Sequence, residues 1–147
     1  MGIEENKDVV RRYFELYNQH DLDSAYEILT PGCFGEGVTL EQSRQLDIMI
    51  FKSFPDWKIT ILDMVAEGDK VAFIENYTGT HTGEPYMGIP PMGKKQDFNA
   101  TRILRIVDYK IVEIKGTEDL LSSAQQLGVL PSIQEAIKTY KEAHNKK

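Results

Sequence analysis

The second half of the chain consists of short runs of β-branched and aromatic residues separated by turn-forming sequences. Such runs favour extended backbone, and they predict four strands, at 58–66, 71–80, 96–107 and 111–116. Tight turns are predicted at 67–70 and 108–110, and a longer loop rich in glycine and proline spans 82–95. Because consecutive strands with such connections pair antiparallel, this half is restricted to an antiparallel meander.

The first half instead places its apolar residues at the 3.6-residue spacing of amphipathic helices. Helices are predicted at 3–19 and 21–29, and a third from Thr39 to Pro55. Thr39 with Gln42 matches a capping box, which marks the start of the third helix.

Two further helices are predicted at the end of the chain. The first spans 118–127, with Asp119 as its N-terminal cap. The second is an extra helix at about 132–144, and its apolar stripe could dock on the chain's own sheet or on a second subunit.

Helices followed by a meander predict one α+β domain over residues 1–147. Helices would pack in the concave face of a curved antiparallel sheet and leave an internal pocket. The chain has 147 residues and 41% hydrophobic residues, enough for one sizeable core, and it contains no long linker.

Charge and composition exclude several partners. The net charge of −6 argues against nucleic-acid binding, which needs clustered Lys and Arg. No apolar run approaches the roughly 20 residues of a membrane-spanning helix, and the acidic start, with Glu4, Glu5 and Asp8, does not match a signal peptide. We therefore expect a cytoplasmic protein with neither nucleic-acid nor membrane partners.

The cysteine and histidines give no sign of a metal site. Cys33 is the single cysteine, which excludes an internal disulfide and predicts a small buried filler. His20, His81 and His144 are scattered over a helix end, a loop and the tail, which does not match a metal-ligand set. His81 is instead predicted to stabilise a turn and His20 to act in local capping at a helix junction, and no metal or cofactor is expected.

Alternation along the strands identifies two unusual residues. Val71, Phe73, Glu75 and Tyr77 would share one inward face, and Phe98, Ala100, Arg102, Leu104 and Ile106 another. Each face is apolar apart from one charge, and an unpaired charge there is costly. Glu75 and Arg102 could form a structural ion pair or lie at a solvated rim. They could also be polar anchors in a pocket, where burial would make Glu75 a candidate general base.

Substrate contacts would come from Arg102 and from the large side chains expected to face the pocket. These are Tyr17, Phe73, Tyr77, Phe98 and Leu104. If these side chains filled the space inside the curved sheet completely, no ligand site would remain.

Seven short strings occur in order along the chain. They are FPDW at 54–57, AEGDKV at 66–71, TGTHTG at 78–83, GIPP at 88–91, GKK at 93–95, KIVE at 110–113 and QQLG at 125–128. Together they resemble the SnoaL-like polyketide cyclase family, within the larger nuclear transport factor 2-like group, from about Lys7 to Gly128. The resemblance implies a cone-shaped α+β barrel with a pocket, and frequent dimerisation. The helix at 132–144 lies beyond the family's usual end.

The resemblance also implies a chemistry whose residues are missing here. Family members close a polyketide ester by an intramolecular aldol reaction without metal or cofactor, using an aspartate in a His-x-Asp pattern on the last strand. That pattern falls on Ile114 and Gly116 of this chain. The assisting polar positions fall near Ala100 and Arg102, and a second family histidine falls near Glu36.

Three functional hypotheses follow. The chain could bind a small, mostly apolar, polyketide-like molecule bearing an anionic or polar group, without turnover. It could be a cofactor-independent cyclase or isomerase with a relocated base, for which Glu75 and Glu36 are the candidates. It could instead be a dimerisation or partner-binding module, and a homodimer is expected in any case.

Overall fold

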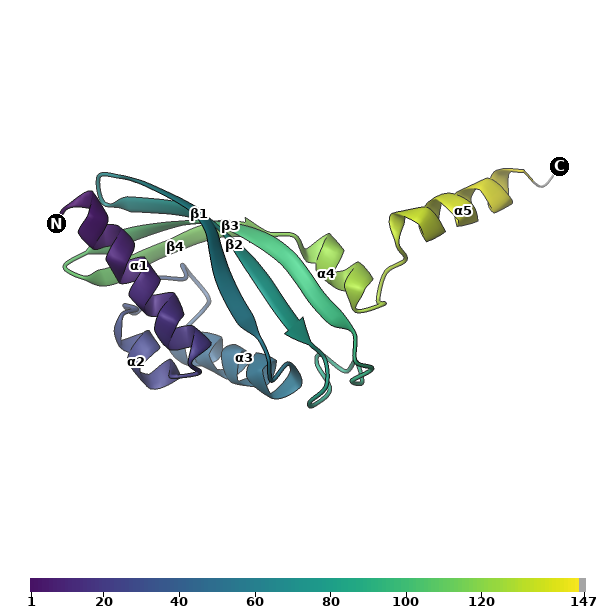
Figure 1. Ribbon diagram of the computed structural model, residues 1–147, viewed down its shortest axis with the longest axis horizontal. Helices are drawn as coiled ribbons and strands as arrows, with labels where there is room; N and C mark the ends of the chain where they lie inside the picture. The colour runs from purple at the N-terminus through teal and green to yellow at the C-terminus, as the bar shows by residue number, and fades with distance from the viewer. Residues whose placement is uncertain (146–147) are drawn as a thin grey trace.

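The computed structural model describes residues 1–145 as helices packed against one curved sheet (Figure 1). The elements in chain order are α1 (Ile3–Asn18), α2 (Leu22–Glu27), α3 (Leu40–Ser53), β1 (Lys58–Glu67), β2 (Lys70–Thr80), β3 (Lys95–Val107), β4 (Lys110–Glu118), α4 (Leu120–Gln126) and α5 (Ile133–His144). Each element predicted from the sequence is present, with ends that differ by a few residues at most. The α+β class is confirmed.

The sheet is a four-stranded antiparallel meander in the order β1-β2-β3-β4. Register shifts between Ile61 and Asp63 in β1 and between Arg105 and Ile106 in β3 mark bulges, which bend and twist strands locally. The sheet curves over α1, α2 and α3, which lie on one side of it in Figure 1. With β1 and β4 as its two edges, the sheet forms an open cone rather than a closed barrel.

The apolar core lies where α1 meets the concave face of the sheet. Val10 of α1, Val71 of β2 and Ile111 of β4 are fully buried there. Phe14 packs edge-on against Phe73, with ring centroids 5.5 Å apart. The predicted alternation is confirmed, because the inward residues of β2 and β3 are buried while their neighbours face outward.

The predicted capping residues set the starts of two helices. Thr39 and Gln42 form the complete capping box at α3, with Thr39 Oγ1 accepting from the Gln42 amide at 3.1 Å. Asp119 caps α4 by accepting from the Ser122 amide at 3.1 Å. Asp119 therefore has the structural role expected for it.

Helix α5 extends away from the body of the molecule (Figure 1). Its stripe residues Ile133, Ile137 and Tyr140 are 56%, 49% and 63% exposed, so the helix does not dock on its own sheet. Within residues 1–145, no helix combines the length and the apolar character needed to cross a membrane.

Ile111→Ala should lower the free energy of unfolding by about 2–5 kcal/mol, because it leaves a cavity at a fully buried site. Ile103→Ala is the matched control, since Ile103 lies on the outer face of the sheet and is 45% exposed; it should cost less than about 1 kcal/mol. Urea denaturation measures both. Equal losses would contradict the assignment of the concave face as the core.

Candidate functional site

A cavity of about 740 Å³ lies between the concave face of the sheet and helices α1 and α3. It is open on one side, and its size falls within the usual range of small-molecule sites. The cone is therefore not filled by its own side chains.

The structure brings most of the predicted site residues to this cavity. Those that line it are Tyr17, Glu75, Tyr77, Phe98 and Arg102. Phe73 and Leu104 are buried in the core and do not line the cavity. Glu36 is exposed in the loop before α3 and does not line it either.

Glu75 and Arg102 form the centre of a hydrogen-bonded cluster on the sheet wall. Glu75 Oε1 accepts from the Tyr77 hydroxyl and, at 3.1 Å, from Arg102 Nε. Arg102 Nη2 also donates to the Tyr77 oxygen at 3.0 Å and to Glu118. The two charges are thus both an ion pair and part of the cavity wall.

The second carboxylate oxygen of Glu75 is in a different situation. The residue is only 1% exposed, and its Oε2 has no hydrogen-bond partner among the described residues. Burial raises the pKa of Glu75, while the hydrogen bond from Tyr77 and the charge of Arg102 oppose the shift. One oxygen of this carboxyl group is therefore held by Tyr77 and Arg102, and the other has no partner among the described residues.

Gly116 provides the space that the Arg102 side chain occupies. The two residues are directly opposite each other in the β3–β4 pairing. A Cβ atom at position 116 would lie 2.1 Å from the Thr101 carbonyl oxygen and 2.8 Å from Arg102 Cδ. An aspartate at this position, as the resemblance implied, is therefore incompatible with the observed place of Arg102. Ile114, at the expected histidine position, lines the cavity as an apolar side chain.

Aromatic rings form the wall next to Glu75. Trp57 stacks on Tyr77 with ring centroids 5.5 Å apart and planes at 25°, and Tyr77 lies 5.0 Å from Phe98. Trp57 lines the cavity, and its buried indole Nε1 has no partner in the described part of the chain. Two residues of the same cavity wall, Trp57 and Glu75, thus each carry a buried polar atom without a partner. Sequence reasoning missed Trp57.

Asp47 is a second carboxylate at the cavity, on the helical wall, and sequence reasoning missed it too. Its Oδ1 accepts from the Tyr17 hydroxyl at 3.2 Å and its Oδ2 from the Tyr26 hydroxyl at 2.5 Å. Burial raises the pKa of Asp47 to about 6, although both tyrosine hydrogen bonds lower it.

A signal for Asp47 exists in the sequence. Positions 40, 43, 47, 50 and 54 follow helical spacing and hold Leu, Ser, Asp, Ile and Phe. A buried helix stripe interrupted by two polar residues indicates a polar site facing the interior.

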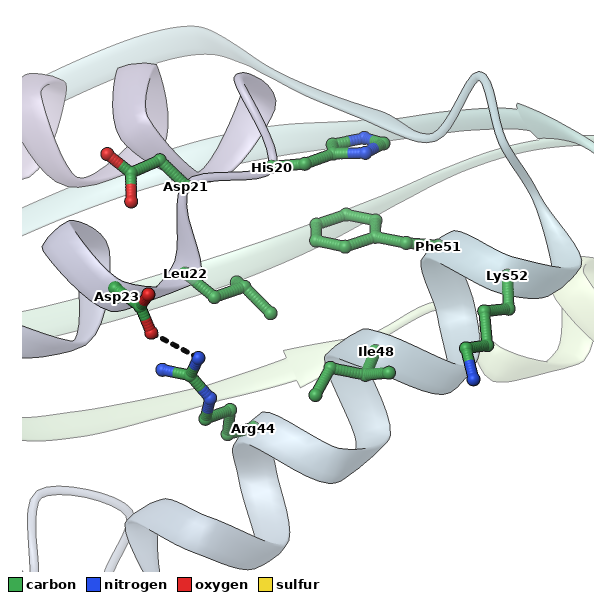
Figure 2. A pocket seen from close by; sticks show the side chains of 8 residues that line it. All are labelled: His20, Asp21, Leu22, Asp23, Arg44, Ile48, Phe51 and Lys52. Carbon is green, nitrogen blue, oxygen red and sulfur yellow. Dashed lines mark hydrogen bonds and ion pairs between the residues drawn. The ribbon is translucent and has the colours of Figure 1, made fainter.

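A second, smaller hollow of about 340 Å³ lies between the α1–α2 turn and α3 (Figure 2). Arg44 is paired there with Asp23, and His20 stacks on Phe51 with ring centroids 3.8 Å apart. We do not assign a ligand to this hollow, because the guanidinium of Arg44 is already paired with Asp23. His81 is buried elsewhere, with Nε2 2.9 Å from the Glu84 carbonyl oxygen. Residues 1–145 contain no cluster of three or more His, Cys, Asp or Glu arranged to hold a metal.

Comparisons with known proteins agree with this architecture. The family model for SnoaL-like polyketide cyclases matches residues 7–127. No curated protein sequence matches.

Solved structures superpose closely. AclR from Streptomyces galilaeus, described as a candidate hydroxylase, is 24% identical over 99% of both chains, with a TM-score of 0.81. A candidate SnoaL-like polyketide cyclase from Jannaschia sp. CCS1 is 25% identical over 88% of this chain and 95% of that chain, with a TM-score of 0.72. IdmH from Streptomyces antibioticus, a candidate polyketide cyclase, is 27% identical over 84% of this chain and 98% of that chain, with a TM-score of 0.71.

Gly116→Ala should destabilise the protein by about 1–3 kcal/mol, because the added methyl group overpacks the contact with Thr101 and Arg102. Thr117→Ala, at the next and exposed position, is the control and should cost less than about 1 kcal/mol. Thermal unfolding distinguishes them. An unchanged stability of Gly116→Ala would show that Arg102 does not occupy this space.

Asp47→Asn should stabilise the protein at high pH. The pKa of Asp47 is about 6 in the folded protein and 3.8 in the reference state, so the wild type loses stability as pH rises from about 4 through 6. The variant lacks this cost and should gain up to about 3 kcal/mol at pH 8, with little difference at pH 4. Urea denaturation at both pH values tests this, and a variant that is less stable at pH 8 would contradict it.

Proposed function

The chain belongs to the SnoaL-like polyketide cyclase family, and on that premise we propose that it is a cofactor-independent enzyme of the cyclase or isomerase class. Its cavity would bind a small, mostly apolar, polyketide-like molecule. Glu75 would remove a proton from a carbon next to a carbonyl group of this molecule.

The observation that carries this proposal is the unpartnered Oε2 of Glu75. A buried carboxylate oxygen without a hydrogen bond is costly, and it belongs to a residue that lines an open cavity. Burial raises the pKa of this group toward the range in which a carboxylate is an effective general base. The bonds from Tyr77 and Arg102 to Oε1 fix the orientation of the carboxylate.

Trp57 supports the same reaction. Loss of a proton next to a carbonyl places negative charge on the carbonyl oxygen, and a fixed N–H donor stabilises that charge. Trp57 is a residue of the cavity wall, and its Nε1 is buried and unpartnered among the described residues. Its stacking on Tyr77 holds the indole beside the Glu75 cluster.

The charges in the cavity favour a neutral polar group on the ligand. Arg102 is already bonded to Glu75 and Glu118, so the cluster carries a net charge of −1 when both carboxylates are ionised. A ligand carboxylate would meet this excess negative charge. We therefore replace the expected anionic group with a carbonyl or hydroxyl group.

We also propose that the protein forms a homodimer through α5. The supporting observation is the stripe Ile133, Ile137 and Tyr140, which is exposed on a helix that extends from the body. A second copy that covered this stripe would bury it. Val129 and Leu130, just before the helix, are exposed as well.

Glu75→Gln should abolish catalysed proton exchange while leaving the fold intact, because the amide retains an acceptor for Arg102 and is not basic. The probe is 2-tetralone in D₂O, with deuterium incorporation next to the carbonyl followed by NMR. Glu67→Gln, at an exposed position on β1, is the matched control and should exchange like wild type. Saturable binding of 2-tetralone to the wild type without exchange would instead support a binding protein.

Ile137→Asp should convert the dimer into a monomer without lowering the thermal stability of the domain, because Ile137 is exposed within one chain. Glu135→Asp, on the same helix, is the control and should leave the assembly unchanged. Sedimentation velocity measures the mass of each. Identical masses for Ile137→Asp and wild type would exclude α5 as the interface.

A further inference from the structure

We propose that Asp47, held by Tyr17 and Tyr26, is a second proton-transfer group of the cavity, which donates a proton to a second oxygen of the substrate. The substrate class is then a dicarbonyl compound, with one carbonyl group near Glu75 and the other near Asp47. This inference rests on the proposed role of Glu75 and adds a proton-donating residue to it.

The first step of the argument is placement. Asp47 comes from α3 and Glu75 from β2, and both side chains line the same cavity. The two carboxylates therefore lie on different walls, one helical and one on the sheet. The ring of Tyr13, from α1, is near enough to both that each carboxylate raises the pKa of its hydroxyl, after burial as the main cause.

The second step is the contrast between the two environments. Glu75 has a cation as its partner, whereas Asp47 is faced only by neutral hydroxyls, from Tyr17 and Tyr26. The nearest cation on its own helix, Arg44, is turned toward Asp23 (Figure 2). Two carboxyl groups with environments this different can divide the acid and base roles, and we assign the base role to Glu75, beside its cation, and the proton-donor role to Asp47.

The third step is that the Asp47 cluster can satisfy both protonation states. The Tyr26 hydroxyl lies 2.5 Å from Asp47 Oδ2 and 2.9 Å from Ser43 Oγ, and it has one proton. With Asp47 ionised, Ser43 donates to Tyr26 and Tyr26 donates to Asp47. With Asp47 protonated and no substrate bound, the chain reverses and the carboxyl group donates to Tyr26; in the proposed reaction it exchanges this hydrogen bond for one to the substrate oxygen. A group that cycles between the two states needs such an arrangement.

The reaction balances without oxidant or cofactor. Glu75 takes a proton from the carbon next to the first carbonyl, and the electron pair forms an enolate. The enolate carbon forms a bond to the second carbonyl carbon, whose oxygen takes the proton of Asp47 and becomes a hydroxyl group. The protein ends with Glu75 protonated and Asp47 ionised, and proton exchange with water restores the starting state.

Two probes separate the roles of the two carboxylates. The first is 2-tetralone, whose single carbonyl needs only Glu75 for exchange. The second is 2,6-heptanedione, whose terminal carbon can attack the far carbonyl to close a six-membered ring. Asp47→Asn should lower kcat/KM for ring closure by about 10²–10⁴-fold, the usual contribution of a general acid, and should lower 2-tetralone exchange by a much smaller factor. Asp63→Asn, a surface aspartate on β1, is the control.

The direction in which the pH profile of ring closure shifts tests the positioning role of Tyr26. Ring closure needs protonated Asp47, so its rate should fall as pH rises through about 6. The hydrogen bond from Tyr26 lowers the pKa of Asp47. Tyr26→Phe should therefore shift the fall in the rate of ring closure to higher pH. Tyr17→Phe should move it in the same direction but less, because its bond is longer at 3.2 Å. A purely structural role for Tyr26 predicts no such movement.

A measurement without turnover keeps this inference separate from the role of Glu75. In protein labelled with ¹³C at the aspartate carboxyls, the Asp47 signal is the one missing from Asp47→Asn. 2,6-Heptanedione should raise the apparent pKa of that signal, because a ligand carbonyl accepts a hydrogen bond only from the protonated form; 2-tetralone should move it less. If exchange fails but this shift occurs, only the role of Glu75 is wrong. Ring closure at the wild-type rate in Asp47→Asn, equal losses of closure and exchange, or no shift with the diketone would overturn the inference.

Discussion

The ion pair between Glu75 and Arg102 sets the arrangement of the sheet wall and, through it, of the cavity. A carboxylate at 1% exposure is tolerated because a guanidinium and a tyrosine hydroxyl bind its Oε1. The guanidinium in turn needs the space that Gly116 leaves on the neighbouring strand. One missing side chain on β4 therefore permits a charged cluster on β2 and β3.

The same cluster explains why the cavity has two chemically different walls. On the sheet, a cation pairs with a buried carboxyl group, and its charge opposes the rise in pKa that burial causes. On the helices, Asp47 has only hydroxyl donors, and burial raises its pKa to about 6. Desolvation therefore acts on both groups, but only Glu75 has a charged partner to oppose it. The curvature of the sheet places these two environments around one volume instead of in separate parts of the core.

Alternation and capping predicted the fold and the two charges of the sheet wall, because period two assigns a strand residue to a face and one charge per face stands out. Alternation does not show whether an inward-facing residue lies beside the cavity or in the closed part of the core. Phe73 and Phe98 both face inward, but the curvature of the sheet leaves only Phe98 beside the cavity. Asp47 is harder to predict, because residue type on α3 does not show which side chains face the interior: Leu46 is 41% exposed, whereas the neighbouring Asp47 is partly buried. Glu36 depended on an alignment across a loop, where no periodicity constrains the position.

The groups whose burial is energetically unfavourable are concentrated at the cavity, where a ligand would bind. A chain that needed only to fold could fill the cone with apolar side chains, and buried ion pairs are often no more stabilising than such packing. This chain keeps two carboxylates, an unpartnered carboxylate oxygen and an unpartnered indole N–H at one cavity, while the neighbouring core around Val10 and Ile111 is apolar and closed. Local departures from favourable burial that gather at one cavity are typical of functional sites. The loss of the family's acid–base pair at 114 and 116 is therefore better explained as a relocation of the polar groups than as a decay of the site, because Gly116 is the residue that makes room for the new ones.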